Sequence, residues 1–434
     1  MEKIVLVENN EIIMDNKTNS EVMNDYFVNI TQNMGIPEFN KEIPPTVTEC
    51  LDPIDKIIYN FNKHPSVTKI NNIIKNTEKF TFNEIDQVGM EKEILHLNSK
   101  KSAGPDNIPP KIVKESSTVL KATLTELFNT SVNENFFPSD LKYANVSPLF
   151  KKGDSTNKEN YRPISILPSI SKIFERLMLQ QMTAYVSSLL SPYLCGFRKG
   201  YNPQHALLRL INHLNKSLDR KENIGLVMMD LSKAFDCIPH DLLIAKLYAY
   251  GFHKNSLKLI HSYLNERHQR VKINSDYSSW KEILDGVPQG SVLGPLLFNI
   301  FINDLFLFVE HSHICNYADD NSLTIADKNI DNIITKLESD IKNLNIWFID
   351  NGMLLNGDKC QFMLIGSSRN LRTENITIDG NTIIESKMGK LLGITIDNQL
   401  TMNEHIKHIC KQASNKLYAL ARISHFLSSH KKRC

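Results

Sequence analysis

Cysteine is sparse and scattered in this sequence of 434 residues, which contains seven. No two of the cysteines share the short spacing of paired zinc ligands, and their odd number does not indicate a framework of disulfides. The segment from Met1 to Val7 is too short and too acidic for a secretory signal peptide. We therefore expect reduced thiols and an intracellular protein.

Long uninterrupted apolar runs are also missing. The two best candidates, residues 177–197 and 286–303, both contain glutamine and proline, so we expect no membrane span. Internal repeats and low-complexity segments are not evident either. The hydrophobic content of 41% and the charged content of 23% are typical of a globular protein. A chain of this length exceeds one ordinary core, which predicts two or more subdomains.

Excess charge of one sign is small overall, because the formal net charge is +2. The charges are unevenly distributed, however. Residues 1–90 are net acidic, whereas residues 386–434 are net basic. A basic segment can lie along a phosphate backbone, where the release of counterions favours binding. It can equally be a solvated helix face, and charge alone does not separate the two interpretations.

Two adjacent acids form the most informative feature of the chain. Asp319 and Asp320 follow a short apolar run and precede a second strand-like run, residues 322–326. This pattern predicts a tight hairpin with both acids at its tip. Neighbouring like charges are costly unless a cation neutralises them, and Mg²⁺ prefers oxygen ligands. The alternative is an ordinary solvated turn.

A third acid ends another apolar run upstream. Residues 224–229 have the length and composition of a buried strand, and Asp230 follows them directly. Asp230 could simply cap the next turn. It could also be a metal ligand in a strand that neighbours the hairpin. Three carboxylates at the ends of adjacent strands can hold two cations about 4 Å apart, the arrangement used for phosphoryl transfer in polymerases and nucleases.

Three motifs occur in an order that resembles one enzyme family. Residues 228–236 read MMDLSKAFD, residues 286–295 read GVPQGSVLGP, and residues 317–320 read YADD. They are similar to motifs A, B and C of reverse transcriptases. The residues of these motifs most closely resemble those of non-LTR, LINE-type retrotransposons of the jockey kind. The resemblance extends from about residue 85 to the C-terminus.

The resemblance implies an α+β fold, the right-hand polymerase. Residues 85–222 would form the fingers with a hairpin at 145–166, and residues 223–397 the palm, an antiparallel sheet backed by helices. Residues 398–434 would begin a helical thumb that is truncated. We expect residues 1–84 to be a separate helical and linker segment. An endonuclease domain precedes this region in such retrotransposons and is missing here, which predicts a fragment or a shortened copy.

Helical spacing of apolar residues predicts further elements. The expected helices cover residues 19–34, 82–97, 171–189, 330–351 and 403–427, and residues 361–365 are expected to form a strand. Asn83 is the candidate cap of the second of these helices.

Basic residues near the tip of the hairpin 145–166 are suited to a triphosphate, since lysine supplies a point charge and arginine a bidentate fork. In reverse transcriptases the corresponding hairpin closes over the incoming nucleotide. The resemblance therefore assigns Arg162, and Lys151 or Lys152, to triphosphate contact. The alternative is that these side chains are merely solvated.

Motifs A and B supply the other candidates for nucleotide binding. A bulky ring at Phe235 would stand under the nucleotide sugar and exclude a 2′-hydroxyl, unless the ring is a plain core aromatic. Leu231 could offer its backbone carbonyl to a metal. Gln289 resembles the glutamine that contacts nucleotide and template. Asp236 is expected to make a structural hydrogen bond with the turn before Pro239.

Lys359 resembles the lysine of motif D, which donates a proton to the leaving pyrophosphate. The resemblance implies an RNA-directed DNA polymerase that uses two Mg²⁺ ions held by Asp230, Asp319 and Asp320. Its partners would be an RNA template, a DNA primer and dNTPs, in the nucleus or cytoplasm, and the sequence does not fix its oligomeric state. One alternative is an inactive truncated relic that only binds nucleic acid. Another is an RNA-directed RNA polymerase, which Phe235 disfavours.

Overall fold

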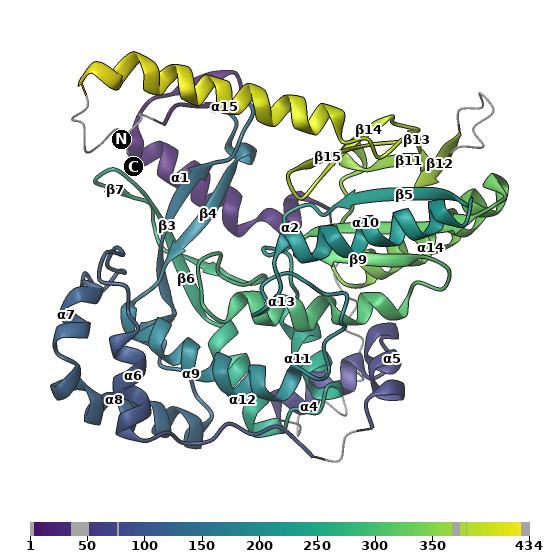
Figure 1. The fold of residues 1–434 in the computed structure, drawn as a ribbon. Coiled ribbons are helices and arrows are strands. Elements are labelled where there is room, and N and C mark those ends of the chain that lie inside the picture. Colours follow the sequence, from purple (N-terminus) through teal and green to yellow (C-terminus); the bar gives the residue numbers. More distant parts are fainter. Residues whose placement is uncertain (1–3, 36–51, 76–77, 367–373, 379, 427–434) are drawn as a thin grey trace. The chain divides into compact units, whose positions relative to one another are not determined.

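The structure, a computed structural model, describes residues 4–35, 52–75, 78–366, 374–378 and 380–426 (Figure 1). Helices and sheets are mixed along the chain, in agreement with the expected α+β class. The chain forms two compact units that alternate in the sequence. Unit 1 comprises Met1–Phe197, Leu231–Phe308 and Ile346–Leu354, and unit 2 comprises Arg198–Asp230, Val309–Asn345 and Leu355–Cys434.

Unit 1 consists mainly of helices, with one five-stranded sheet and a separate hairpin of β1 and β2. Its helices are α1 (Asn16–Val28), α2 (Ile30–Asn33), α4 (Pro53–Phe61), α5 (Pro65–Ile73), α6 (Gln87–Leu95), α7 (Pro110–Glu115), α8 (Ser117–Glu134), α9 (Ser169–Val186), α11 (His240–Ala249), α12 (Lys254–Leu264) and α13 (Gly294–Ile302). Its strands are β1 (Leu6–Glu8), β2 (Glu11–Ile13), β3 (Tyr143–Phe150), β4 (Tyr161–Ile166), β6 (Arg267–Ile273), β7 (Asp276–Tyr277) and β8 (Lys281–Ile283).

The sheet of unit 1 has the strand order β4-β3-β6-β7, with β8 also paired to β6. Strands β3 and β4 form the antiparallel hairpin that the sequence predicts, whereas β3 and β6 run parallel. Alternate residues of β6 are buried, which matches a sheet with one covered face.

The N-terminal residues help to cover that face. Met23, Phe27 and Ile30 share a hydrophobic cluster with Val146 of β3 and Val271 of β6. The described N-terminal residues therefore pack within unit 1. The division into four consecutive regions, with residues 1–84 as a helical and linker segment, stays a prediction.

Unit 2 is built on a second sheet, of order β11-β5-β10-β9. Its strands are β5 (Asn223–Asp230), β9 (His313–Tyr317), β10 (Asp320–Asp327), β11 (Gln361–Ile365), β12 (Asn375–Ile378), β13 (Asn381–Ile384), β14 (Met388–Leu391) and β15 (Ile394–Asp397). Its helices are α10 (Pro203–Asp219), α15 (Asn403–Ile423) and most of α14 (Ile330–Asp350). All the pairings within the four-stranded sheet are antiparallel.

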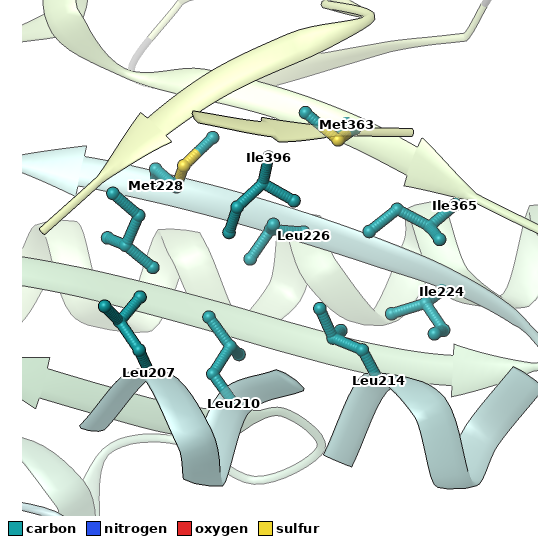
Figure 2. Close-up of a cluster of buried hydrophobic side chains, with 10 residues drawn as sticks. Leu207, Leu210, Leu214, Ile224, Leu226, Met228, Met363, Ile365 and Ile396 are labelled. Atoms are coloured by element: carbon teal, nitrogen blue, oxygen red, sulfur yellow. The ribbon is translucent and has the colours of Figure 1, made fainter. Parts of the chain in front are cut away.

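Strand β5 lies inside this sheet and is buried along almost its whole length. Figure 2 shows the leucines of α10 beside Ile224, Leu226 and Met228 of the strand. On the opposite face, a Cβ atom at Gly225 would come within 2.5 Å of side-chain atoms of Ile333 and Leu337. Glycine therefore allows α14 to pack closely on the sheet. Helices thus cover both faces of the strand that ends at Asp230.

Helix α15 follows the small strands of unit 2 and differs from the other long helices, because none of its 21 residues is buried. Its apolar side chains recur at helical spacing, and Ile406, Leu417 and Leu420 are all about half exposed or more. Among the described residues, no helix combines the length and the apolar character needed to cross a bilayer.

Candidate active site

The three acids of the predicted metal site meet at one end of the unit 2 sheet. In the antiparallel pairing of β5 with β10, Asp320 lies directly opposite Asp230. Directly paired residues direct their side chains to the same face, with Cβ atoms about 4.5–5.5 Å apart. Asp319 precedes β10 in the tight turn from β9, as the sequence predicts. All three residues are partly exposed to solvent.

Two buried asparagines support the turn that carries Asp319. The side-chain Nδ2 of Asn316 donates to the backbone oxygen of Ala318 at 2.7 Å and to Oδ1 of Asn321 at 2.9 Å. Nδ2 of Asn321 donates to the backbone oxygen of Asp319 at 3.3 Å. These bonds stabilise a strained backbone, since Ala318 has a φ of 56°. The turn therefore holds its acids in a fixed conformation.

Lys359 lies beside the same strand end. The backbone N–H of Asn356 donates to the carbonyl of Asp230 at 2.9 Å, which anchors the loop that carries Lys359. The Lys359 Nζ is 2.8 Å from Oδ2 of Asp230. The lysine that resembles that of motif D thus neutralises one of the three acids in this structure.

The chemistry of this group suits a hard divalent cation, because all the side-chain donors are carboxylate oxygens. Within the described part of the chain, however, no three His, Cys, Asp or Glu side chains are arranged as a metal site. The Nζ of Lys359, at 2.8 Å, contacts one oxygen of Asp230 in this structure.

The six candidates for nucleotide binding all belong to unit 1, whereas the three acids and Lys359 all belong to unit 2. Arg162 is exposed on β4, where it pairs across the hairpin with Leu149. Lys151 and Lys152 follow β3 directly and are exposed in the connection to β4. The backbone N–H of Lys151 donates to the carbonyl of Asn160 at 2.9 Å, which closes the hairpin.

Phe235 is held between two other rings of unit 1. It stacks on Phe298 of α13 with ring centroids 4.4 Å apart, and it meets Phe197 edge-on at 5.5 Å. The ring is nevertheless partly exposed, so it is both packed and accessible. Leu231, at the start of the same segment, has a buried side chain. Rigid support from neighbouring rings is what a steric barrier against a sugar hydroxyl requires.

Gln289 does not project freely from the loop before α13. Its Nε2 donates to both carboxylate oxygens of Asp236, at 2.9 and 2.8 Å. Asp236 was expected to bond with the turn before Pro239, and its partner is instead this glutamine. Burial raises the pKa of Asp236 to about 6, although the hydrogen bond from Gln289 and the charges of Lys233 and Arg162 oppose that rise.

Sequence reasoning missed Asn316 and Asn321 altogether. Both flank the YADD motif within strands that are mostly buried, and both are almost completely buried. An amide inside a buried strand needs partners, so this symmetric pair of asparagines was a usable signal.

Residues 150–396 match the model of the family described as reverse transcriptase (RNA-dependent DNA polymerase). A probable RNA-directed DNA polymerase from transposon BS of Drosophila melanogaster is 30% identical over 75% of this chain and 37% of that protein. The RNA-directed DNA polymerase from mobile element jockey of the same species is 29% identical over 78% of this chain and 38% of that protein. The chain thus spans less than two fifths of the length of these relatives.

Proposed function

Because the chain belongs to the reverse transcriptase (RNA-dependent DNA polymerase) family, we propose that it extends the 3′-hydroxyl of a DNA primer with dNTPs on an RNA template. The observation that carries the proposal is the register that pairs Asp320 with Asp230 next to the Asp319 turn. Relatives from the BS and jockey elements, which are named RNA-directed DNA polymerases, support RNA as the template. The site of action would be intracellular, in the nucleus or cytoplasm.

Asp230, Asp319 and Asp320 are the residues that would hold two Mg²⁺ ions. Bound there, the ions would act as Lewis acids toward the primer hydroxyl and the triphosphate. Lys359 lies 2.8 Å from Asp230 and carries protons at the edge of this group. In the proposal, Lys359 first separates from the Asp230 carboxylate. It then donates a proton to the leaving pyrophosphate.

The unit 1 side chains bind and select the nucleotide in this proposal. Arg162, together with Lys151 or Lys152, would neutralise the triphosphate, and all three are exposed near one hairpin end. The Phe235 ring, fixed by stacking on Phe298, would exclude a 2′-hydroxyl. Gln289 would contact the nucleotide, and the backbone carbonyl of Leu231 would complete the metal ligands.

The test is extension of a DNA primer on an RNA template in the presence of Mg²⁺. Asp319→Asn keeps the size of the side chain and removes one anionic ligand, so extension should fall by about 10³-fold or more. The matched control is Asp327→Asn, at the other end of β10, where the carboxylate pairs with Lys336 at 3.2 Å. The control should extend primers at the wild-type rate. Extension by Asp319→Asn at a rate close to wild type would reject the assignment.

Two further readouts separate the alternatives. An inactive relic would bind a template–primer duplex without incorporating nucleotides. A polymerase that makes RNA would incorporate NTPs as readily as dNTPs, which the ring at Phe235 argues against.

A further inference from the structure

The Gln289 side chain has a single orientation in this structure. Its Nε2 lies 2.9 and 2.8 Å from the two oxygens of Asp236. An ionised carboxylate only accepts hydrogen bonds, so it can bind the NH₂ end of an amide but not the carbonyl end. As long as Asp236 is ionised, the other amide atom, Oε1, is directed away from it. Gln289 then directs the Oε1 acceptor to its far side, and the second N–H of Nε2 stays outside the contact, because both carboxylate oxygens lie on the same side of that nitrogen.

The backbone on both sides of Gln289 is fixed independently of that contact. The N–H of Ser165 donates to the carbonyl of Gln289 at 2.7 Å. Gly290 packs so closely on β4 that a Cβ atom would lie 2.5 Å from the Ser165 carbonyl, and its φ is +127°. Further along, Glu175 of α9 accepts the backbone N–H groups of Val292 and Leu293. Only the side-chain torsions of Gln289 remain free, and Asp236 removes that freedom.

The surroundings of the pair are too confined for a nucleotide on the Asp236 side. Asp236 and Gln289 both line a small cavity of about 30 Å³, together with Thr31, Asp285 and Ser165. That volume is sufficient for about two water molecules. A nucleotide does not fit into this cavity, so in the proposal it meets Gln289 outside the cavity.

We propose that Asp236 is a positioning residue, which fixes the Gln289 amide so that Oε1 is presented to the incoming nucleotide as a hydrogen-bond acceptor. The inference rests on the proposed function, because it assumes that Gln289 contacts the nucleotide. Asp236 acts on the substrate through Gln289, and Oε1 is the atom of Gln289 that contacts the nucleotide.

The orientation depends on the charge of Asp236, so it should depend on pH. Protonated, Asp236 carries an O–H donor that can bond to Oε1, which allows the amide to turn round. Burial raises the pKa of this carboxyl to about 6, just below neutral. The titratable groups that interact electrostatically with it are Tyr26 of α1, Arg162 of β4, and Lys233 and Cys237 of its own turn.

Asp236→Asn is the informative variant, because asparagine has the same shape without the charge. Its Oδ1 can still accept from Nε2 of Gln289 and its Nδ2 can donate to Oε1, so the glutamine amide is no longer held in one orientation. The fold should lose no stability, since a poorly solvated charge has been removed. The KM for dNTPs should nevertheless rise about fivefold to tenfold, the size of one net hydrogen bond, with kcat changed less than about twofold. A purely structural aspartate would give the opposite result, a loss of stability with unchanged KM.

Two controls make the comparison specific. Asp285→Asn removes the same charge from the same cavity, where that carboxylate accepts from the Thr31 hydroxyl at 3.0 Å, and should leave KM unchanged. Gln289→Ala should raise KM by itself, and adding Asp236→Asn to it should have no further effect. An equal rise in KM with and without Gln289 would overturn the proposal, as would an unchanged KM in Asp236→Asn.

A measurement without catalysis separates this inference from the proposed function. In the wild-type protein, the side-chain amide resonances of Gln289 should shift with an apparent pKa of about 6, and in Asp236→Asn they should not. If the wild-type chain extends no primers but this titration is seen, the proposed function fails and the Asp236–Gln289 contact stands without its substrate role. If the resonances do not respond to pH or to the substitution, Asp236 does not position Gln289.

Discussion

Replacing Lys359 with methionine should tighten the binding of Mg²⁺ and, at the same time, slow primer extension. The two effects have opposite signs because the lysine contacts a proposed metal ligand and is also the proposed proton donor. Its Nζ is 2.8 Å from Oδ2 of Asp230, so a cation that binds this oxygen must displace the lysine. Methionine keeps most of the side-chain volume and cannot compete.

The size of the first effect follows from the exposure of the pair. The side chains of Lys359 and Asp230 are 45% and 24% exposed, and such ion pairs contribute about 0.2–1 kcal/mol. Since 1.4 kcal/mol corresponds to a tenfold change, Mg²⁺ should bind about 1.4-fold to fivefold more tightly to Lys359→Met. The loss of a positioned general acid should lower the rate of extension by about 10²-fold to 10⁴-fold.

Calorimetric titration of the protein with Mg²⁺ measures the first effect, and single-turnover primer extension measures the second. Lys336→Met is the matched control, because Lys336 pairs with Asp327 of the same unit and the two side chains are 42% and 24% exposed. It should leave both quantities unchanged. Equal or weaker Mg²⁺ binding by Lys359→Met would refute the competition, and a rate within about twofold of wild type would refute the role as proton donor.

Two further predictions concern buried polar groups. Asp304→Asn should lower the free energy of unfolding by about 3–5 kcal/mol at neutral pH, because Lys246 is completely buried with its Nζ 2.6 Å from Asp304. Burial lowers the pKa of Lys246 in the folded protein to about 8, and removing the Asp304 charge, which raises that pKa, should lower it further. Below about pH 8 the wild-type fold therefore binds more protons than the Asp304→Asn fold, so the deficit in urea unfolding should shrink as pH rises toward about 8 and stay constant above it. Asn321→Leu should cost about 1–3 kcal/mol, since it leaves the buried Asn316 amide short of a partner, and should lower primer extension through the Asp319 turn. Wild-type extension by a correctly folded Asn321→Leu protein would show that the turn does not need this support.

The strands that carry the proposed metal ligands could be predicted from the sequence, because short runs of consecutive apolar residues indicate them. An apolar run that ends in a carboxylate predicted residues 224–229, and the strand observed is Asn223–Asp230. The strand predicted at 361–365 has those bounds in β11. In each case a short, mostly apolar run was sufficient.

Helix starts were less predictable, because distant residues compete for the polar groups nearby. The helix expected over residues 82–97 begins at Gln87, and Asp86, not Asn83, accepts from the N–H of Gly89 to cap it. The N–H of Asn83 instead donates to Oε1 of Gln181, 98 positions away. Nothing in the sequence around Asn83 indicates that partner.

The side-chain contacts of the site were the least accessible to sequence reasoning. Asp236 and Gln289 are 53 positions apart, and each stands in a recognisable motif without any sign that the two are bonded. The ion pair of Lys359 with Asp230 spans 129 positions. The motifs indicated which residues matter, and only the tertiary structure identified the atoms that they contact.

The alternation of the two units has a consequence for how the protein is made. Unit 1 needs residues as late as Leu354, and unit 2 needs segments on both sides of that point. Neither can therefore finish folding on the ribosome while its early segments emerge, nor be expressed from one contiguous stretch of the gene. Nascent α1 and α4 must wait for β6 and α11, which are translated more than a hundred codons later. Dissecting the activities of this chain thus calls for point substitutions, since excised fragments would lack part of their own core.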